Sequence, residues 1–184
     1  MIARPREFDN DKVLDALRDV FWQHGYDGTS YADIMAATGL QKGSLYAAFG
    51  DKRALYEIAL ARYDDAQVSQ AVALLGDMMI LPKARIKAMF DSLIIAAETP
   101  QGRWGCLLCN ASVDQAPREA DVEQAVQNGI NRIKSSIASC VKGTSAAKST
   151  ELIWASYFGG QILVKAGCKK ATLKNLQKQI LALF

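Results

Sequence analysis

The segment Thr29–Lys52, TSYADIMAATGLQKGSLYAAFGDK, restricts the possible fold more than any other part of the sequence. Apolar residues recur at helical spacing on both sides of Gly39, and glycine adopts the left-handed backbone of a tight turn without steric conflict. Ser30, followed three residues later by Asp33, resembles a capping box and favours a helix start there. The segment therefore predicts two short helices that meet through a tight turn, a helix-turn-helix. Four apolar side chains have the spacing to pack between these helices: Ile34, Leu40, Leu45 and Ala48.

The rest of the chain also has helical spacing, and no strand-like alternation stands out. The sequence predicts an all-α protein with an N-terminal three-helix helix-turn-helix domain and a larger helical-bundle domain. Short helices give way to long ones near Gly50, so we expect the first domain to cover residues 1–50 and the second to cover residues 51–184. A helix expected from Lys52 to Leu75 would span about 36 Å.

Charge is distributed unevenly along the chain. The net charge is +3, but residues 1–65 hold 8 Lys and Arg against 11 Asp and Glu, which leaves 14 basic and 8 acidic residues for the remainder. The N-terminal part therefore lacks the net positive charge that commonly indicates a DNA-binding domain. Any contact with DNA there must depend on a few placed residues and on helix N-termini.

Several classes of function are disfavoured by the composition. A Gly-rich phosphate loop and a Ser/His/Asp set are missing, and the single histidine, His24, leaves no common general base, so we expect no enzyme and no cofactor. Cys106 and Cys109 form a C-x-x-C without a second pair or nearby histidines, a weak zinc signal, so we expect no metal. We expect a cytoplasmic protein without a membrane partner, because no apolar run is long enough to span a bilayer and no signal-peptide pattern opens the chain.

The second helix of the predicted motif begins with small and polar residues, Gln41-Lys42-Gly43-Ser44. Such an N-terminus can approach the major groove closely. Gln41 has the chemistry to read a base edge, and Lys42 to reach a phosphate or a guanine. Gly43 would let the backbone come near double-stranded DNA.

The stretch GLQKGSLYAAFGDK closely resembles the TetR-type pattern of a turn glycine, a short recognition helix, Tyr-x-x-Phe and a lysine that opens the next helix. The resemblance covers about Val13 to Leu60 and implies roles for individual residues. Thr29 and Ser30 would bind phosphate through hydroxyl and backbone N–H groups, Tyr46 through its phenol and Lys52 through its charge. The resemblance also implies a repressor that leaves a palindromic operator when an unknown small-molecule inducer binds. The alternative is a helical ligand-binding or redox-sensing module without specific DNA binding.

The resemblance further implies a ligand pocket and a homodimer in the second domain. Candidate pocket residues, for which plain core packing is the alternative, are Met89, Phe90, Leu93, Trp104, Leu108 and Tyr157. The last two helices carry apolar stripes that either form a two-fold interface or complete the core of one chain. The interface candidates are Trp154, Phe158, Ile162, Leu173, Leu176 and Ile180.

Cys106 is a candidate sensor thiol. It follows Arg103 and Gly105 at an expected helix N-terminus, where the cation and the helix dipole would favour a thiolate. The alternative is a buried, inert cysteine beside Cys109. Thiol modification is therefore a second possible signal for release from DNA.

Overall fold

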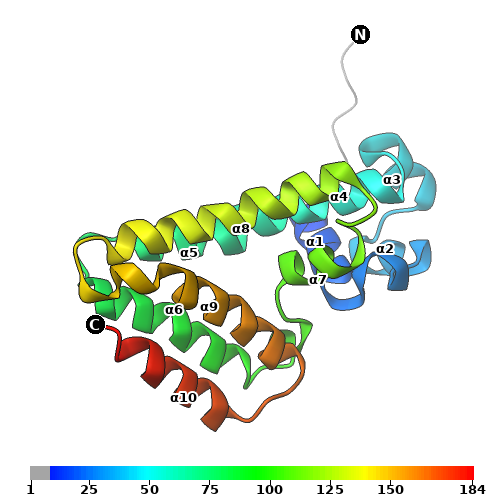
Figure 1. Ribbon diagram of the computed structural model, residues 1–184. Helices are drawn as coiled ribbons and strands as arrows, with labels where there is room; N and C mark the ends of the chain where they lie inside the picture. Colours follow the sequence, from blue (N-terminus) through cyan, green and yellow to red (C-terminus); the bar gives the residue numbers. More distant parts are fainter. Residues whose placement is uncertain (1–8) are drawn as a thin grey trace. The chain divides into compact units, whose positions relative to one another are not determined.

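The computed structural model describes residues 9–184, and every regular element in this range is a helix (Figure 1). The predicted all-α class is confirmed. The helices are α1 (Asn10–Gly28), α2 (Tyr31–Thr38), α3 (Lys42–Phe49), α4 (Lys52–Tyr63), α5 (Ser69–Gly76), α6 (Pro82–Ala96), α7 (Leu107–Asp114), α8 (Ala120–Val141), α9 (Thr150–Lys165) and α10 (Lys170–Leu181). Shorter turns of other helix types are η1 (Asp64–Val68), η2 (Gln101–Trp104) and η3 (Ser145–Ser149).

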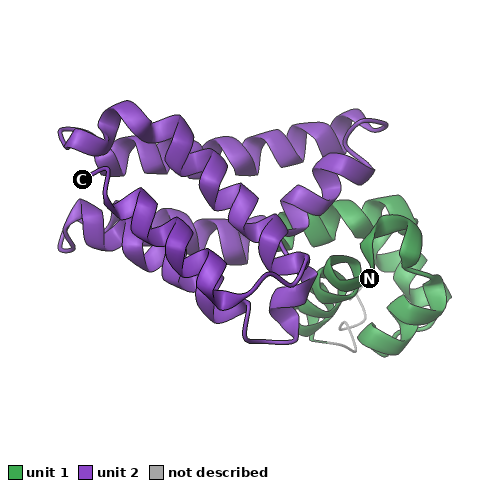
Figure 2. Ribbon diagram, turned by 60° about the horizontal axis from the view of Figure 1, so that its bottom comes forward, with its two compact units in different colours: residues 1–63 green, residues 64–184 purple. Residues whose placement is uncertain are grey.

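The chain divides into two compact units, which meet in the sequence at Tyr63 and Asp64 (Figure 2). The sequence predicted this division at residue 50, whereas the first unit also contains α4. The reason is that α4 packs along α1 and buries Leu55 and Tyr56 almost completely. Burial of the apolar face of α4 against α1 makes α4 part of the first unit.

The core of the first unit is rich in aromatic rings. Phe21 of α1 lies edge-on to Tyr56 of α4, with ring centroids 5.2 Å apart, and Trp22 lies edge-on to Tyr63 at 4.9 Å. Edge-to-face pairs of this kind add about 0.5–1.5 kcal/mol to the burial of the rings. The α1–α4 pair therefore holds most of the core of this unit, and α2 packs against α1.

Local signals explain where the short helices begin. The Ser30 hydroxyl accepts a hydrogen bond from the Asp33 N–H, and the Asp33 carboxylate accepts one from the Ser30 N–H, so the predicted capping box is present. Asp51 accepts from the N–H of Ala54 at 3.0 Å and caps α4 in the same way.

The predicted packing between α2 and α3 is only partly correct. Ile34 and Leu45 are fully buried and Leu40 is half-buried, but Ala48 is exposed. Leu45 is the one fully buried residue of α3. This helix of 8 residues contacts the rest of the unit along one narrow face, and its other faces stay open.

The second unit is a bundle of the longer helices. Its core contains large side chains of α6, including Ile86, Met89, Phe90 and Leu93, together with α8 and α9 residues such as Ile137 and Ile153. Within residues 9–184, no helix combines the length and the apolar character that a membrane span requires.

The long helix predicted from Lys52 to Leu75 is present in outline, since helical structure continues from α4 through η1 into α5. It is not a uniform α-helix, however, because η1 is π-helical. Apolar spacing does not reveal such an insertion, which changes the winding without ending the helix.

Candidate nucleic-acid interface

The turn between α2 and α3 has the geometry that a helix-turn-helix requires. Gly39 is left-handed (φ 70°, ψ 6°), and its N–H donates to the carbonyl of Met35. The Thr38 hydroxyl donates to the carbonyl of Ile34 at 2.7 Å and accepts from the N–H of Leu40. These bonds end α2 and hold the start of α3 close to it.

The N-terminal part of α3 presents a polar, open face. Gln41, Lys42, Gly43 and Ser44 are all exposed, and Tyr46 is 62% exposed. A Cβ added to Gly43 would meet no heavy atom within 4 Å, so packing inside the unit does not require a glycine there. Gln41 makes no side-chain cap bond to the first turn. The helix start is therefore accessible from solvent, and its first turn is not capped by the Gln41 side chain.

Lys42 of this face and Lys52 at the start of α4 both lie over tyrosine rings. The Lys42 Nζ is 4.5 Å from the ring centroid of Tyr31, and the Lys52 Nζ is 4.5 Å from that of Tyr26. Cation–π contacts at exposed sites contribute about 0.5–1 kcal/mol. They orient both ammonium groups and are weak enough for either group to turn toward a phosphate.

Thr29 and Ser30 have other partners than those expected for phosphate contacts. Thr29 is 1% exposed, and its hydroxyl donates to the carbonyl of Gly25 at 2.6 Å. Ser30 is exposed, but its hydroxyl and N–H both donate to the Asp33 carboxylate, and these bonds lower the pKa of Asp33. The Thr29 hydroxyl is therefore not available for the expected contact, and a phosphate at Ser30 would have to displace Asp33.

In the second unit, the residues expected to line a pocket are closely packed. Met89, Phe90, Leu93, Leu108 and Tyr157 are 1–7% exposed, and Trp104 is half-buried. The Phe90 and Tyr157 ring centroids are 6.0 Å apart. Burial raises the pKa of Tyr157 to about 12. A ligand would need these side chains to move before it could lie among them.

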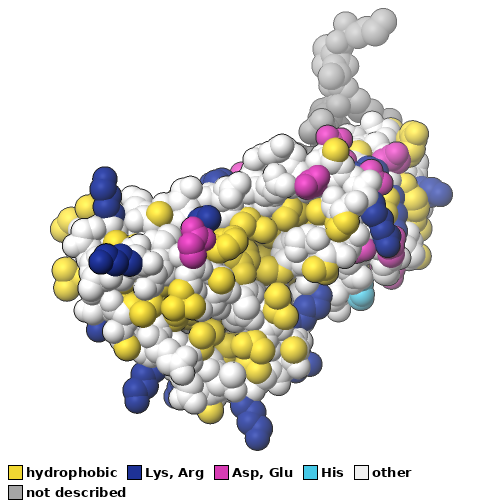
Figure 3. Space-filling model, viewed as in Figure 1, with side chains coloured by type: hydrophobic (Ala, Val, Ile, Leu, Met, Phe, Trp, Pro, Cys, Tyr) yellow, Lys and Arg dark blue, Asp and Glu magenta, His cyan; other side chains and the backbone are white. Residues whose placement is uncertain are grey.

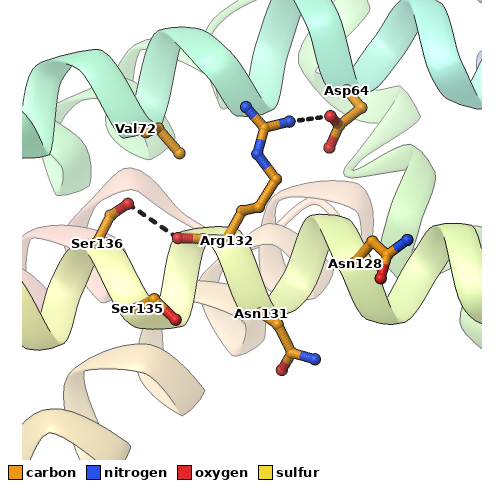
Figure 4. Close-up of a pocket in the computed structure, with 7 residues that line it drawn as sticks. All are labelled: Asp64, Val72, Asn128, Asn131, Arg132, Ser135 and Ser136. Carbon is orange, nitrogen blue, oxygen red and sulfur yellow. Dashed lines mark hydrogen bonds and ion pairs between the residues drawn. The ribbon is translucent and has the colours of Figure 1, made fainter.

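An open hollow of about 720 Å³ lies elsewhere in this unit, between η1, α5 and α8 (Figure 4). It is lined by one apolar residue, Val72, and by six polar or charged residues: Asp64, Asn128, Asn131, Arg132, Ser135 and Ser136. None of these residues was selected in the sequence analysis. Arg132 of α8 reaches across to Asp64, which is 68 positions away in the chain. Neither residue belongs to a local motif, so no sequence signal pointed to the pair.

The thiol pair lies at the start of α7. Cys106 is the N-cap residue and is 4% exposed, and its side chain is hydrogen-bonded to that of Cys109. This hydrogen bond and burial raise the pKa of Cys109, while the charge of Lys165 acts in the opposite direction. The Lys165 Nζ also donates to Asn110 at 2.7 Å. Within residues 9–184, no three His, Cys, Asp or Glu side chains lie together in a way that would hold a metal ion.

The interface candidates of α9 and α10 divide into two groups. Trp154 and Phe158 of α9 are half-buried, Ile162 is 58% exposed, and hydrophobic side chains gather around α9 in the surface view (Figure 3). Leu152 and Leu163 are further exposed residues of α9 that extend this surface, and Leu152 was not expected from the sequence.

The stripe on α10 faces mostly inward. Leu173 and Ile180 are buried and Leu176 is half-buried, because α10 packs on α6 within one chain. For Leu173 and Ile180 this packing favours the stated alternative, that the stripe completes the core of one chain. Helical periodicity shows that a face is apolar, but it does not show which neighbour covers it.

Two family models match the sequence. "Bacterial regulatory proteins, tetR family" matches residues 13–59, and "Tetracyclin repressor-like, C-terminal domain" matches residues 82–152. The HTH-type transcriptional repressor ComR of Escherichia coli (strain K12) is 30% identical over 126 residues, which are 68% of this chain and 60% of ComR. The uncharacterized HTH-type transcriptional regulator YezE of Bacillus subtilis (strain 168) is 29% identical over 66% of this chain and 62% of YezE. The matched region spans less than two thirds of either relative.

Solved structures show the same fold over almost the whole chain. A cysteine mutant of the TetR family transcriptional regulator CifR, complexed with a 26 bp double-strand operator DNA, has a TM-score of 0.80 at 24% identity and covers 97% of this chain and 98% of that one. The reduced form of E. coli NemR has a TM-score of 0.79 at 18% identity and covers 92% of this chain and 93% of that one. At these identities, the likeness concerns the fold.

Proposed function

Because the chain belongs to the TetR family of transcriptional regulators, we propose that it is a DNA-binding repressor. In this proposal two copies form a homodimer and place their α3 helices one DNA turn apart on a palindromic operator. A small ligand or a thiol modification in the second unit lowers the affinity for the operator. The relatives are named transcriptional regulators, in agreement with the expectation that the chain is not an enzyme.

The observation that carries this proposal is the exposed polar face of α3. A helix that only completed a bundle would bury more than Leu45 and would not need a glycine at position 43. Gln41, Lys42 and Tyr46 instead offer an amide, a cation and a phenol on one open surface. These groups suit base edges and phosphates of a major groove.

Fluorescence anisotropy with labelled DNA tests this function. A duplex from beside the protein's own gene and a scrambled duplex are compared at fixed salt, because phosphate contacts make affinity strongly dependent on salt. We expect the native duplex to bind about 1000-fold more tightly, which is within the range of specific recognition. Gln41→Ala should relax this preference, and Tyr46→Phe should weaken binding to both duplexes. If neither substitution changes DNA affinity, the alternative of a ligand-binding module without specific DNA binding is favoured.

The thiol route to release is proposed at Cys106. Its support is the position of Cys106 at the N-cap of α7, where its side chain is hydrogen-bonded to that of Cys109. Cys140 is a matched control, since it is also buried and its thiol donates to the carbonyl of Pro82. After brief exposure to N-ethylmaleimide, mass spectrometry should find Cys106 modified before Cys140. If Cys106 stays unmodified while the denatured protein reacts, this route is rejected and release by a small ligand remains.

A further inference from the structure

The connection between α5 and α6 exposes four consecutive large apolar side chains, residues 78–81, which we call the apolar tip. Met78 is 83% exposed, Met79 94%, Ile80 38% and Leu81 77%. Single apolar residues are common on protein surfaces, but a designed or natural chain seldom exposes such a run without a function for it. The apolar surface of α9 belongs to another segment of the chain and does not account for this run.

Hydrogen bonds hold the apolar tip in its exposed form. The Met79 N–H donates to Asp77 Oδ1 at 2.9 Å, and the Ile80 N–H donates to the Asp77 carbonyl at 3.2 Å. The guanidinium of Arg85 on α6, a residue that is 4% exposed, donates to the carbonyl of Leu75 at the end of α5 at 2.5 Å. These bonds fix both the turn and the helix end before it, so the exposure of the four side chains is built into the fold of this connection.

Basic side chains lie around the apolar tip. The end of α8 lies beside the start of α6, since the Cys140 thiol donates to the Pro82 carbonyl at 3.7 Å (Figure 1). The chain segments 77–83 and 142–148 therefore share one end of the second unit, and Figure 3 shows hydrophobic and basic side chains together there. This end carries three exposed lysines: Lys83, Lys142 and Lys148. Asp77 is the one carboxylate residue in these two segments.

The lysines at the tip lack carboxylate partners. Within residues 9–184, none of the three forms an ion pair, whereas Lys87 pairs with Asp91 and Lys170 with Glu98. A second copy bound tip to tip would bring these like charges together, which opposes association. An anionic lipid surface attracts lysines and accepts protruding apolar side chains without needing a matching pocket. Of these two occupants, the lipid surface fits both the charge and the exposed run.

We propose that the apolar tip and its three lysines dock on an anionic lipid surface. In the docked form the most exposed side chains, Met78, Met79 and Leu81, enter the boundary between headgroups and acyl chains, while the lysines contact lipid phosphates. The contact is peripheral and needs no spanning helix, the feature whose absence led us to expect no membrane partner. It goes beyond the proposed function and does not depend on it.

Cosedimentation of the full-length chain with lipid vesicles tests this inference. Vesicles of phosphatidylglycerol and phosphatidylcholine are compared with vesicles of phosphatidylcholine alone, without DNA. We expect binding to the anionic vesicles and much weaker binding to the neutral ones, together with slower amide hydrogen exchange at residues 77–83 on the anionic vesicles. Binding should weaken in about 1 M salt, where the Debye length is about 3 Å.

Matched variants separate the tip from the rest of the surface. Met79→Ser should bind the anionic vesicles about tenfold more weakly, because one apolar side chain no longer leaves water. Val113→Ser changes an 81% exposed residue of α7 and should bind as the wild type does. Lys142→Gln should bind about fivefold more weakly, whereas Lys174→Gln, which removes an exposed charge from α10, should stay close to the wild type.

Three results would overturn the inference. The first is a wild-type chain that binds neither kind of vesicle. The second is equal weakening by Lys142→Gln and Lys174→Gln with no effect of Met79→Ser, which would mean that only the net charge of the chain attracts it. The third is a larger species in light scattering that Met79→Ser abolishes while vesicles bind no protein, which would assign the apolar tip to a second copy of the chain.

Discussion

Neighbouring side chains on α3 have opposite environments. Leu45 is fully buried, whereas Tyr46 beside it is largely exposed. The first unit has a net negative charge, so its proposed affinity for DNA must come from a few such exposed groups and not from a general positive field. Each proposed phosphate contact should therefore have a measurable share in the salt dependence.

The substitution Lys52→Gln tests this at the level of one charge. Lys52 lies over the Tyr26 ring, where its ammonium group can turn toward a phosphate. We expect weaker binding to all DNA sequences and a plot of log affinity against log salt whose slope is smaller by about 1. Lys142→Gln removes an equal charge from the exposed segment after α8 and should leave the slope unchanged. An equal decrease in both variants would mean that only net charge matters.

At the level of helices, ion pairs between α1 and α4 add to the packing of their apolar faces. Asp15 of α1 accepts hydrogen bonds from Arg62 of α4 at 2.9 Å and from Arg18 at 2.8 Å. The hydrogen bond from Arg62, together with the charges of both arginines, holds the pKa of Asp15 below its usual value, although burial acts in the opposite direction. These bonds connect the first helix to the last helix of the first unit.

This pair predicts a dependence of stability on pH. Because the pKa of Asp15 is lower in the folded state, its contribution is fully present above the unfolded pKa, near 4, and is lost as the pH falls through the folded value. Asp15→Asn should therefore have a lower urea midpoint than the wild type at pH 7. Between pH 5 and pH 3, the midpoint of the variant should fall by less than that of the wild type. Asp121→Asn, which removes an exposed carboxyl from α8, serves as the control. Parallel pH profiles for the wild type and Asp15→Asn would contradict the assignment.

In a single chain, α9 exposes an apolar surface. Leu152, Ile162 and Leu163 are 38–58% exposed on this helix, and Trp154 and Phe158 are half-buried beside them. An apolar surface of this kind often marks an interface between proteins. In the proposed homodimer it would be buried against the same surface of the second copy.

Ile162→Asp tests the proposed interface against a matched isoleucine. Ile95 of α6 is 63% exposed, close to the 58% of Ile162, so Ile95→Asp introduces the same charge at a similar exposure. We expect light scattering to show a dimer for the wild type and for Ile95→Asp, and a monomer for Ile162→Asp, because a buried unpaired carboxylate opposes association. Operator affinity should fall with the dimer. A dimeric Ile162→Asp would place the interface elsewhere.

The sequence by itself determined the features that depend on neighbours in the chain. Helical spacing predicted an all-α fold, the Ser30–Asp33 pair predicted the capping box, and Gly39 predicted the left-handed turn, because each results from interactions within a few residues. The exposed start of α3 was also predictable, since polar residues and a glycine leave little to bury.

Only the tertiary structure decided what covers each apolar stripe and which distant groups meet. Leu173 and Ile180 carry the same pattern as an interface helix, yet they are buried because α10 packs on α6. Asp64 and Arg132 form no motif, yet they meet across η1 and α8. Periodicity and capping act over one or two helical turns, whereas burial and long-range ion pairs depend on how whole helices pack against one another.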